Sequence, residues 1–101
     1  MSTYAVDKAC RRVVLDPEFR ARLHADPEGA LRSCSPALSE EEVRCLLAGD
    51  VGRLGRLGAN HFLLHQLGRW EVLGLTLPEY ARRIREEYRE ERERWAAERQ
   101  E

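Results

Sequence analysis

With 101 residues, the chain is long enough for one domain built around one hydrophobic core. Charged residues make up 35% of it, yet the formal net charge is only −1, which excludes the basic footprint typical of a nucleic-acid-binding protein. No window reaches the roughly 18 apolar residues of a membrane span, and the first residues lack the pattern of a secretory signal. We therefore expect a cytoplasmic protein that binds neither nucleic acid nor a membrane.

Helix start and stop signals recur along the chain, whereas no segment alternates apolar and polar residues as a strand does. This pattern predicts an all-α fold. The first helix is expected over residues 3–14. Asp16 and Asp26 each precede a proline that can occupy the first helical position, which predicts helices over 17–24 and 27–33.

The middle of the chain repeats these signals. Ser39 and Glu42 have the spacing of a capping box, which predicts a helix over 40–48 that ends at a left-handed Gly49. Asp50 is the expected N-cap of a short helix.

A more apolar helix follows. Asn60 is its expected N-cap, and leucines at helical spacing extend it over about 61–73. The predicted core positions are Val13, Phe19, Leu23, Leu31, Val43, Leu46, Leu47, Leu54, Leu57, Leu63, Leu64, Leu67 and Trp70.

The segment from residue 49 to residue 68 contains five glycines. It is not a phosphate-binding loop, because it has neither the G-x-x-x-x-G-K-[ST] pattern nor G-x-G-x-x-G. Gly52 and Gly55 lie inside the predicted short helix, where each costs up to about 1 kcal/mol relative to alanine. Their presence predicts that another backbone, of this chain or of a partner, approaches this helix closely.

The end of the chain predicts a long charged helix that begins after Thr76. Four of its residues follow a 4,3,4 spacing and would line one stripe: Ile84, Tyr88, Glu91 and Trp95. Large aromatic residues on a polar helix are typical interface anchors, so we expect a homodimer through Tyr88 and Trp95. The alternative is a solvated helix, because Glu91 interrupts the apolar stripe.

The sequence thus divides into a compact domain of five or six helices at residues 1–78 and a charged C-terminal helix at 79–101. Cys10, Cys34 and Cys45 form no C-x-x-C pair, which is typical of reduced thiols.

His61 and His65 are spaced four apart and would share one helix face. A zinc or non-haem iron site needs a third ligand, commonly a carboxylate, and the chain has no H-E-x-x-H motif. Three interpretations stay open: part of a metal site, ordinary polar positions, and partner contacts. Serines and a cysteine at residues 33–35 lack the surrounding turn and base of a catalytic nucleophile. We expect no catalytic, cofactor-binding or metal-binding residue in this chain.

Three segments in order carry a resemblance: DPEGAL at 26–31, LSEEEVRCLLAGD at 38–50 and LGRLGANHFLLHQL at 54–67. The ordered set resembles the LigA-like family, the small alpha subunit of protocatechuate 4,5-dioxygenase, which is an extradiol ring-cleavage dioxygenase. The likeness covers about residues 13–67 and is best in LLAGD followed by LGAN.

In that family an all-helical small subunit associates with a large subunit, which holds non-haem iron(II) and carries the catalytic residues, and helps to close the substrate cavity. The resemblance implies a non-catalytic accessory subunit without activity of its own. It also implies that the glycines form a tight junction presenting the helix after it, and we assign partner contacts to Asn60, His61, Phe62 and His65. The family includes stand-alone small proteins, so the alternative is a helical protein- or peptide-binding module for a biosynthetic enzyme, unrelated to ring cleavage.

Overall fold

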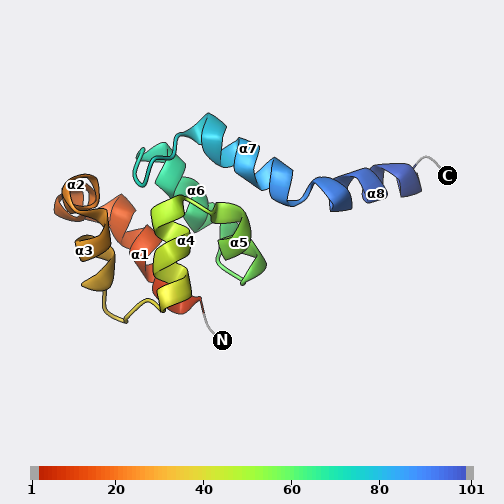
Figure 1. Cartoon of the computed structure of the whole chain (residues 1–101). Coiled ribbons are helices and arrows are strands. Elements are labelled where there is room, and N and C mark those ends of the chain that lie inside the picture. The colour runs from red at the N-terminus through yellow and green to blue at the C-terminus, as the bar shows by residue number, and fades with distance from the viewer. Residues whose placement is uncertain (1–2, 100–101) are drawn as a thin grey trace.

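The computed structural model describes residues 3–99, which form eight helices and no strand (Figure 1). In chain order the helices are α1 (Tyr4–Leu15), α2 (Pro17–Ala25), α3 (Pro27–Arg32), α4 (Glu40–Ala48), α5 (Val51–Arg56), α6 (His61–Arg69), α7 (Leu77–Glu87) and α8 (Arg89–Arg99). The predicted all-α fold is confirmed, and α1 to α6 are the helices expected before residue 78. None of these eight helices has both the length and the apolar character needed to cross a membrane.

The helix starts are those that the sequence predicts. Six residues bind the backbone of a first helical turn through a side-chain oxygen: Asp16, Asp26, Ser39, Asp50, Asn60 and Thr76. The capping box is present, since Ser39 Oγ accepts from the Glu42 N–H at 3.1 Å and Glu42 Oε1 accepts from the Ser39 N–H at 2.7 Å. Each such cap stabilises its helix by about 0.5–2 kcal/mol, because the first N–H groups of a helix have no partner within it. As predicted, α4 ends at Gly49 with a left-handed φ of 66°.

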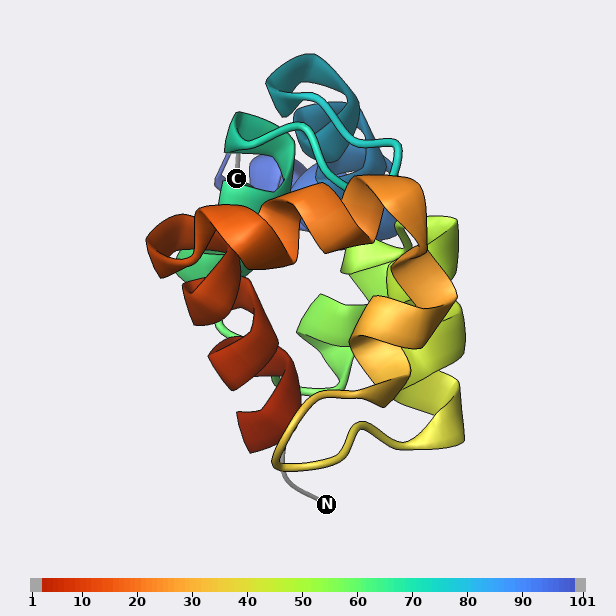
Figure 2. The same cartoon turned by 90° about the vertical axis from the view of Figure 1, so that its left-hand side faces the viewer.

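Helices α1 to α7 pack around one core. α1 lies against α2 and α6, α4 lies between α3 and α5, and α7 crosses α5 and α6. Figure 2 shows α1 at the left, α2 across the top, and α3 and α4 at the right. The largest fully buried side chains include Phe19, Leu31, Leu46, Leu54, Leu64, Leu67 and Leu75.

Most predicted core positions are buried, but the prediction that Leu47 belongs to the core is wrong. Leu46 faces the core, whereas Leu47 is 36% exposed. The buried face of α4 includes Val43, Cys45 and Leu46, and Leu47 lies about 200° round the helix from Cys45, outside that face. Leu57 is half-buried, and so are Leu63 and Trp70, which pack against the core.

Helix α6 is shorter than predicted and ends at Arg69 instead of near residue 73. Glu71 and Leu73 have left-handed φ angles of 52° and 56°, which an α-helix does not contain. The cause is the returning chain: the Thr76 carbonyl oxygen would lie 2.8 Å from a Cβ placed on Gly68. The chain therefore turns directly over the end of α6 and begins α7.

The predicted charged C-terminal segment is helical, but it is not one long helix, because it is divided at Tyr88, with φ −105° and ψ 17°. Arg56 Nη2 donates to the Glu87 carbonyl oxygen at 2.9 Å. In a continuous helix that oxygen would accept from the N–H of residue 91. The described chain measures 51 × 28 × 20 Å. α8, which has no buried residue, extends away from the other helices (Figure 1).

Candidate functional site

The start of α6, where the sequence predicts partner contacts, is fixed from two sides. The Asn60 N–H donates to Asp7 Oδ1 of α1 at 2.9 Å, while Asn60 Oδ1 accepts from the Leu63 N–H at 3.1 Å. From α7, the Tyr80 hydroxyl donates to the His61 carbonyl oxygen at 3.1 Å. Two neighbouring helices thus hold the first turn of α6 in place.

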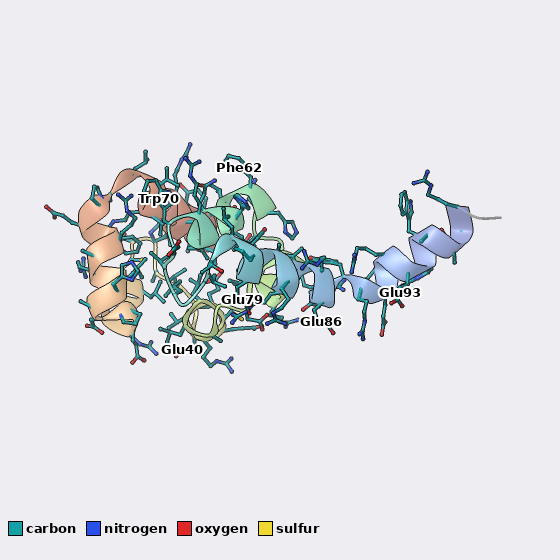
Figure 3. All side chains as sticks on the ribbon, turned by 90° about the horizontal axis from the view of Figure 1, so that it is seen from above. Glu40, Phe62, Trp70, Glu79, Glu86 and Glu93 are labelled. Carbon is teal, nitrogen blue, oxygen red and sulfur yellow. The ribbon has the colours of Figure 1, made fainter. Side chains whose placement is uncertain are left out.

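Phe62 lies on this fixed turn and is 73% exposed. Figure 3 shows it on the outer side of α6. Beside it, at the end of α1, Leu15 is 74% exposed. Both residues line a groove of about 810 Å³ between the two helices, which we call the α1/α6 groove; its walls include Arg11, Val14, Leu15, Phe62, Leu63 and Arg69.

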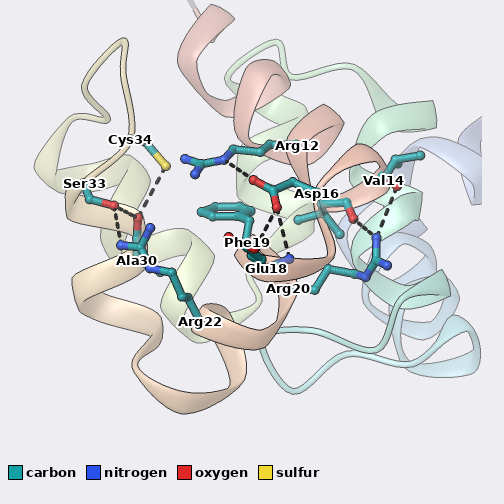
Figure 4. A network of polar contacts seen from close by, with 11 residues as sticks. Arg12, Val14, Asp16, Glu18, Phe19, Arg20, Arg22, Ala30, Ser33 and Cys34 are labelled. Carbon is teal, nitrogen blue, oxygen red and sulfur yellow. Dashed lines mark hydrogen bonds and ion pairs between the residues drawn. The ribbon is translucent and has the colours of Figure 1, made fainter.

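Leu15 is the last residue of α1, directly before the corner between α1 and α2, whose hydrogen bonds are drawn in Figure 4. Asp16 accepts from the Phe19 N–H and from Arg12 Nε, each at 3.1 Å. These two bonds, the backbone bond first, lower the pKa of the Asp16 carboxyl. Arg20 Nη1 donates to a carbonyl oxygen in the last turn of α1 at 2.6 Å. Hydrogen bonds on both sides of Leu15 therefore hold it at the surface.

Sequence reasoning missed Leu15 and Arg11 as contact candidates. The helical period contained a signal, because α1 buries Val6, Cys10 and Val13 on one face. Leu15 is rotated by about 200° from Val13, so it is an apolar residue on the face opposite the core.

His61 and His65 face two different tyrosines. The centroid of the exposed His61 ring lies 5.8 Å from that of Tyr88, and the half-buried His65 ring lies 5.4 Å from that of Tyr80, both edge to face. Within residues 3–99, no three histidine, cysteine, aspartate or glutamate residues are grouped as metal ligands. The pair therefore does not fit an iron site of two histidines and a carboxylate.

The glycines of α5 allow α7 to cross it closely. A Cβ on Gly52 would lie 2.7 Å from the Cβ of Glu87, and a Cβ on Gly55 would lie 2.6 Å from His61 Cε1 and 3.1 Å from the Tyr88 hydroxyl. A close approach to both glycines is present and comes from within this chain, but the nearest atoms belong to side chains and not, as predicted, to another backbone. The junction brings His61 beside Tyr88 at the start of α6.

A comparison with protein families matches most of the chain to a known family. The model described as "Aromatic-ring-opening dioxygenase LigAB, LigA subunit" covers residues 6–86. The chain belongs to the LigA subunit family. The matched range contains the start of α6 and all the residues that line the α1/α6 groove. It is longer than the likeness over about residues 13–67 that the sequence itself shows. Neither the curated proteins nor the solved structures include a match to this chain.

Helix α8 lies outside the range matched by the LigA subunit family. The side chain of Arg56, in α5, contacts the junction between α7 and α8. Arg56 Nε donates to Glu87 Oε2 at 3.0 Å, and its Nη2 donates to Glu91 Oε1 at 2.6 Å. The same guanidinium lies 4.4 Å from the centroid of the Tyr88 ring. We call these contacts, with the bond to the Glu87 carbonyl, the Arg56 clamp. Its bonds raise the pKa of Arg56, and Arg56 holds the pKa of Glu91 below its usual range.

Because of the Arg56 clamp, the two predicted dimer anchors differ in how much surface they offer to a partner. Tyr88 is half-buried between Arg56 and His61, so much of its ring is already in contact within the chain. Trp95 is 57% exposed, and its ring contacts the guanidinium of Arg99, 4.6 Å from the ring centroid. Of the two aromatic residues, Trp95 offers the freer surface.

Proposed function

We propose that this LigA-family chain is a non-catalytic accessory subunit that docks onto the large catalytic subunit of an extradiol ring-opening dioxygenase and helps to close its substrate cavity. The proposal is supported by membership of the LigA subunit family over residues 6–86. Phe62 is the single structural observation that carries it. A large aromatic side chain is exposed on a helix start that both neighbouring helices fix.

An exposed, fixed phenylalanine suits a docking role. Full burial of such a side chain contributes about 1.5–3 kcal/mol. The backbone around Phe62 is already ordered by the bonds to Asp7 and Tyr80, so binding costs little further conformational entropy. His61 is also exposed, beside Phe62. Asn60 already caps α6, and the His65 ring already contacts the ring of Tyr80.

In this proposal the large subunit holds the iron(II) that the ring-opening reaction requires. The described residues of this chain do not fit such a site, because their paired histidines face different tyrosines. The accessory chain contributes binding surface and cover for the cavity, and no step of the chemistry is assigned to it.

Reconstitution tests this function. A large subunit encoded in the same genome is assayed for ring opening of protocatechuate, alone and with this chain added in equal amount. We expect activity to rise on addition and the chain alone to have none. Unchanged activity on addition, or ring opening by the chain alone, would contradict the proposal.

A stand-alone module that binds a protein or peptide of a biosynthetic pathway is the second candidate. One observation favours it: α8, with its exposed Trp95, lies outside the range that the family model matches. A genome without any large dioxygenase subunit would favour this candidate over the accessory subunit.

We also propose that the chain forms a homodimer, with Trp95 as the exposed anchor. Light scattering on the full chain and on Trp95→Ala tests this assembly. The expected result is a dimer that dissociates in the variant, because the variant loses the large apolar side chain of α8. A monomer in both samples would exclude the dimer.

A further inference from the structure

The α1/α6 groove combines the two most exposed large hydrophobic residues of the described chain. Leu15 and Phe62 are each more exposed than Tyr4, Leu77 or Trp95. They come from separate helices yet line the same groove, and the half-buried Val14 and Leu63 extend its apolar wall. Scattered surface hydrophobic residues are ordinary, but a continuous exposed apolar wall marks an interaction site.

The charges of the groove have one sign. Its charged lining residues are Arg11 and Arg69. In the part of the chain that the structure describes, neither forms an ion pair, whereas the nearby Asp16 is paired with Arg12. Asp7, the acidic residue near the start of α6, accepts from the Asn60 N–H. The apolar wall therefore lies beside two arginines without a carboxylate partner.

We infer that the α1/α6 groove binds an acidic amphipathic helix of the large subunit; this inference rests on the proposed function. The helix places apolar residues against Leu15 and Phe62, and its carboxylates pair with Arg11 and Arg69. A groove between two helices is the geometry in which partner helices bind by an apolar face. From Phe62 to Arg69 the wall spans about 10 Å, or two helical turns of the partner.

Charge complementarity selects this partner over helix α8 of a second copy of the chain. The exposed helix α8 contains four arginines and four glutamates, so it carries no net charge to match two unpaired arginines. One of those glutamates, Glu91, is already bound to Arg56. A partner helix rich in glutamate or aspartate satisfies both arginines and is steered toward them.

Calorimetric titration of the large subunit with native chain and variants tests the inference. Leu15→Ser, and separately Arg11→Glu combined with Arg69→Glu, are expected to weaken binding at least tenfold. The matched controls are Leu77→Ser, an exposed leucine at the start of α7, and Arg44→Glu, an exposed arginine of α4. Both controls should bind like the native chain. Circular dichroism confirms that each variant is folded.

The outcomes separate this inference from the proposed function. A large subunit that binds native chain and groove variants equally would overturn the inference and leave the accessory role standing. A large subunit that does not bind the native chain would overturn the accessory role and, with it, the large subunit as the source of the helix. The chemistry of the groove is then tested by itself with a peptide.

The peptide probe is an 18-residue helix with leucine at every third or fourth position and glutamate elsewhere, and its twin carries lysine in place of glutamate. We expect the acidic peptide to bind at least tenfold more tightly and to shift amide resonances of residues 11–15 and 62–69. Equal binding of the twins, shifts at other residues, or no binding of either peptide would overturn the inferred partner chemistry.

Discussion

Gly52 shows at the scale of one residue how tertiary packing opposes helix propensity. Inside a helix, alanine is favoured over glycine by about 1 kcal/mol. At this position, however, a Cβ would lie 2.7 Å from the Cβ of Glu87, which is fixed to the α7 backbone. At Gly55 the nearest atom would be Cε1 of His61, at the far end of an exposed side chain that can rotate.

We therefore predict that Gly52→Ala lowers the free energy of unfolding by about 1–3 kcal/mol, the usual range for overpacking. Gly55→Ala is the matched variant in the same helix, and it should change stability by less. Urea unfolding followed by circular dichroism measures both. Greater stability of Gly52→Ala than of the native chain would show that α7 does not lie against α5 at this distance.

The three thiols are free and differ in environment. Burial, with a smaller effect of Asp7, raises the pKa of Cys10 to about 12. Burial also raises the pKa of the half-buried Cys34, but the nearby Arg12 and Arg22 oppose that shift. Since the thiolate is the reactive form, access and charge both favour Cys34.

We predict that Ellman's reagent at pH 8 modifies Cys34 first and Cys10 last in the folded protein. The Cys34→Ser variant should lose the fast phase, while denaturant should make the remaining thiols react rapidly. A fast phase that persists in Cys34→Ser would contradict the burial of the other two thiols.

At the scale of helices, the sequence predicts starts better than ends. Starts depend on local chemistry: the carboxylate of Asp16 or the hydroxyl of Ser39 binds N–H groups two or three residues away. The end of α6 and the break at Tyr88 depend on contacts distant in sequence. Gly68 meets the returning chain at Thr76, and at the break the Glu87 carbonyl oxygen accepts from Arg56, more than thirty residues earlier. Hydrophobic spacing carries no information about such contacts.

The Arg56 clamp gives a prediction for α8. An isolated helix of 11 residues is marginal in water, and this one has no buried residue, so its order depends on its start. In Arg56→Gln the bonds to the Glu87 and Glu91 carboxylates and the contact with the Tyr88 ring are lost. We expect the ¹⁵N relaxation order parameters of residues 89–99 to fall, while those of α1 to α6 stay unchanged.

Arg53→Gln is the matched control for the clamp, because Arg53 lies on the same helix but pairs with Glu41 of α4. Its α8 should remain as ordered as in the native chain. Equal mobility of α8 in the native chain and in both variants would exclude a role of Arg56 in holding the helix.

For the whole molecule, the resemblance predicted the family and directed attention to the start of α6. It did not predict the contribution of α1, because the position of Leu15 beside Phe62 follows from the packing of helices distant in sequence. The division of the chain at residue 78 stays a prediction, as do the partner contacts of Asn60, His61, Phe62, His65, Tyr88 and Trp95. The division falls within the first turn of α7, which begins at Leu77, and Tyr80 of that helix is buried in the core.

Docking through Phe62 is the central claim, and the mass of the complex in solution tests it most directly. Size-exclusion chromatography with light scattering is applied to the large subunit mixed with native chain, with Phe62→Asp and with Leu77→Asp, an exposed leucine outside the groove. We predict a complex with the native chain and with Leu77→Asp, and separate subunits with Phe62→Asp, because the variant loses the apolar anchor and its charged carboxylate must give up water at the interface. A complex of equal mass and stability with Phe62→Asp, or none with the native chain, would contradict the claim.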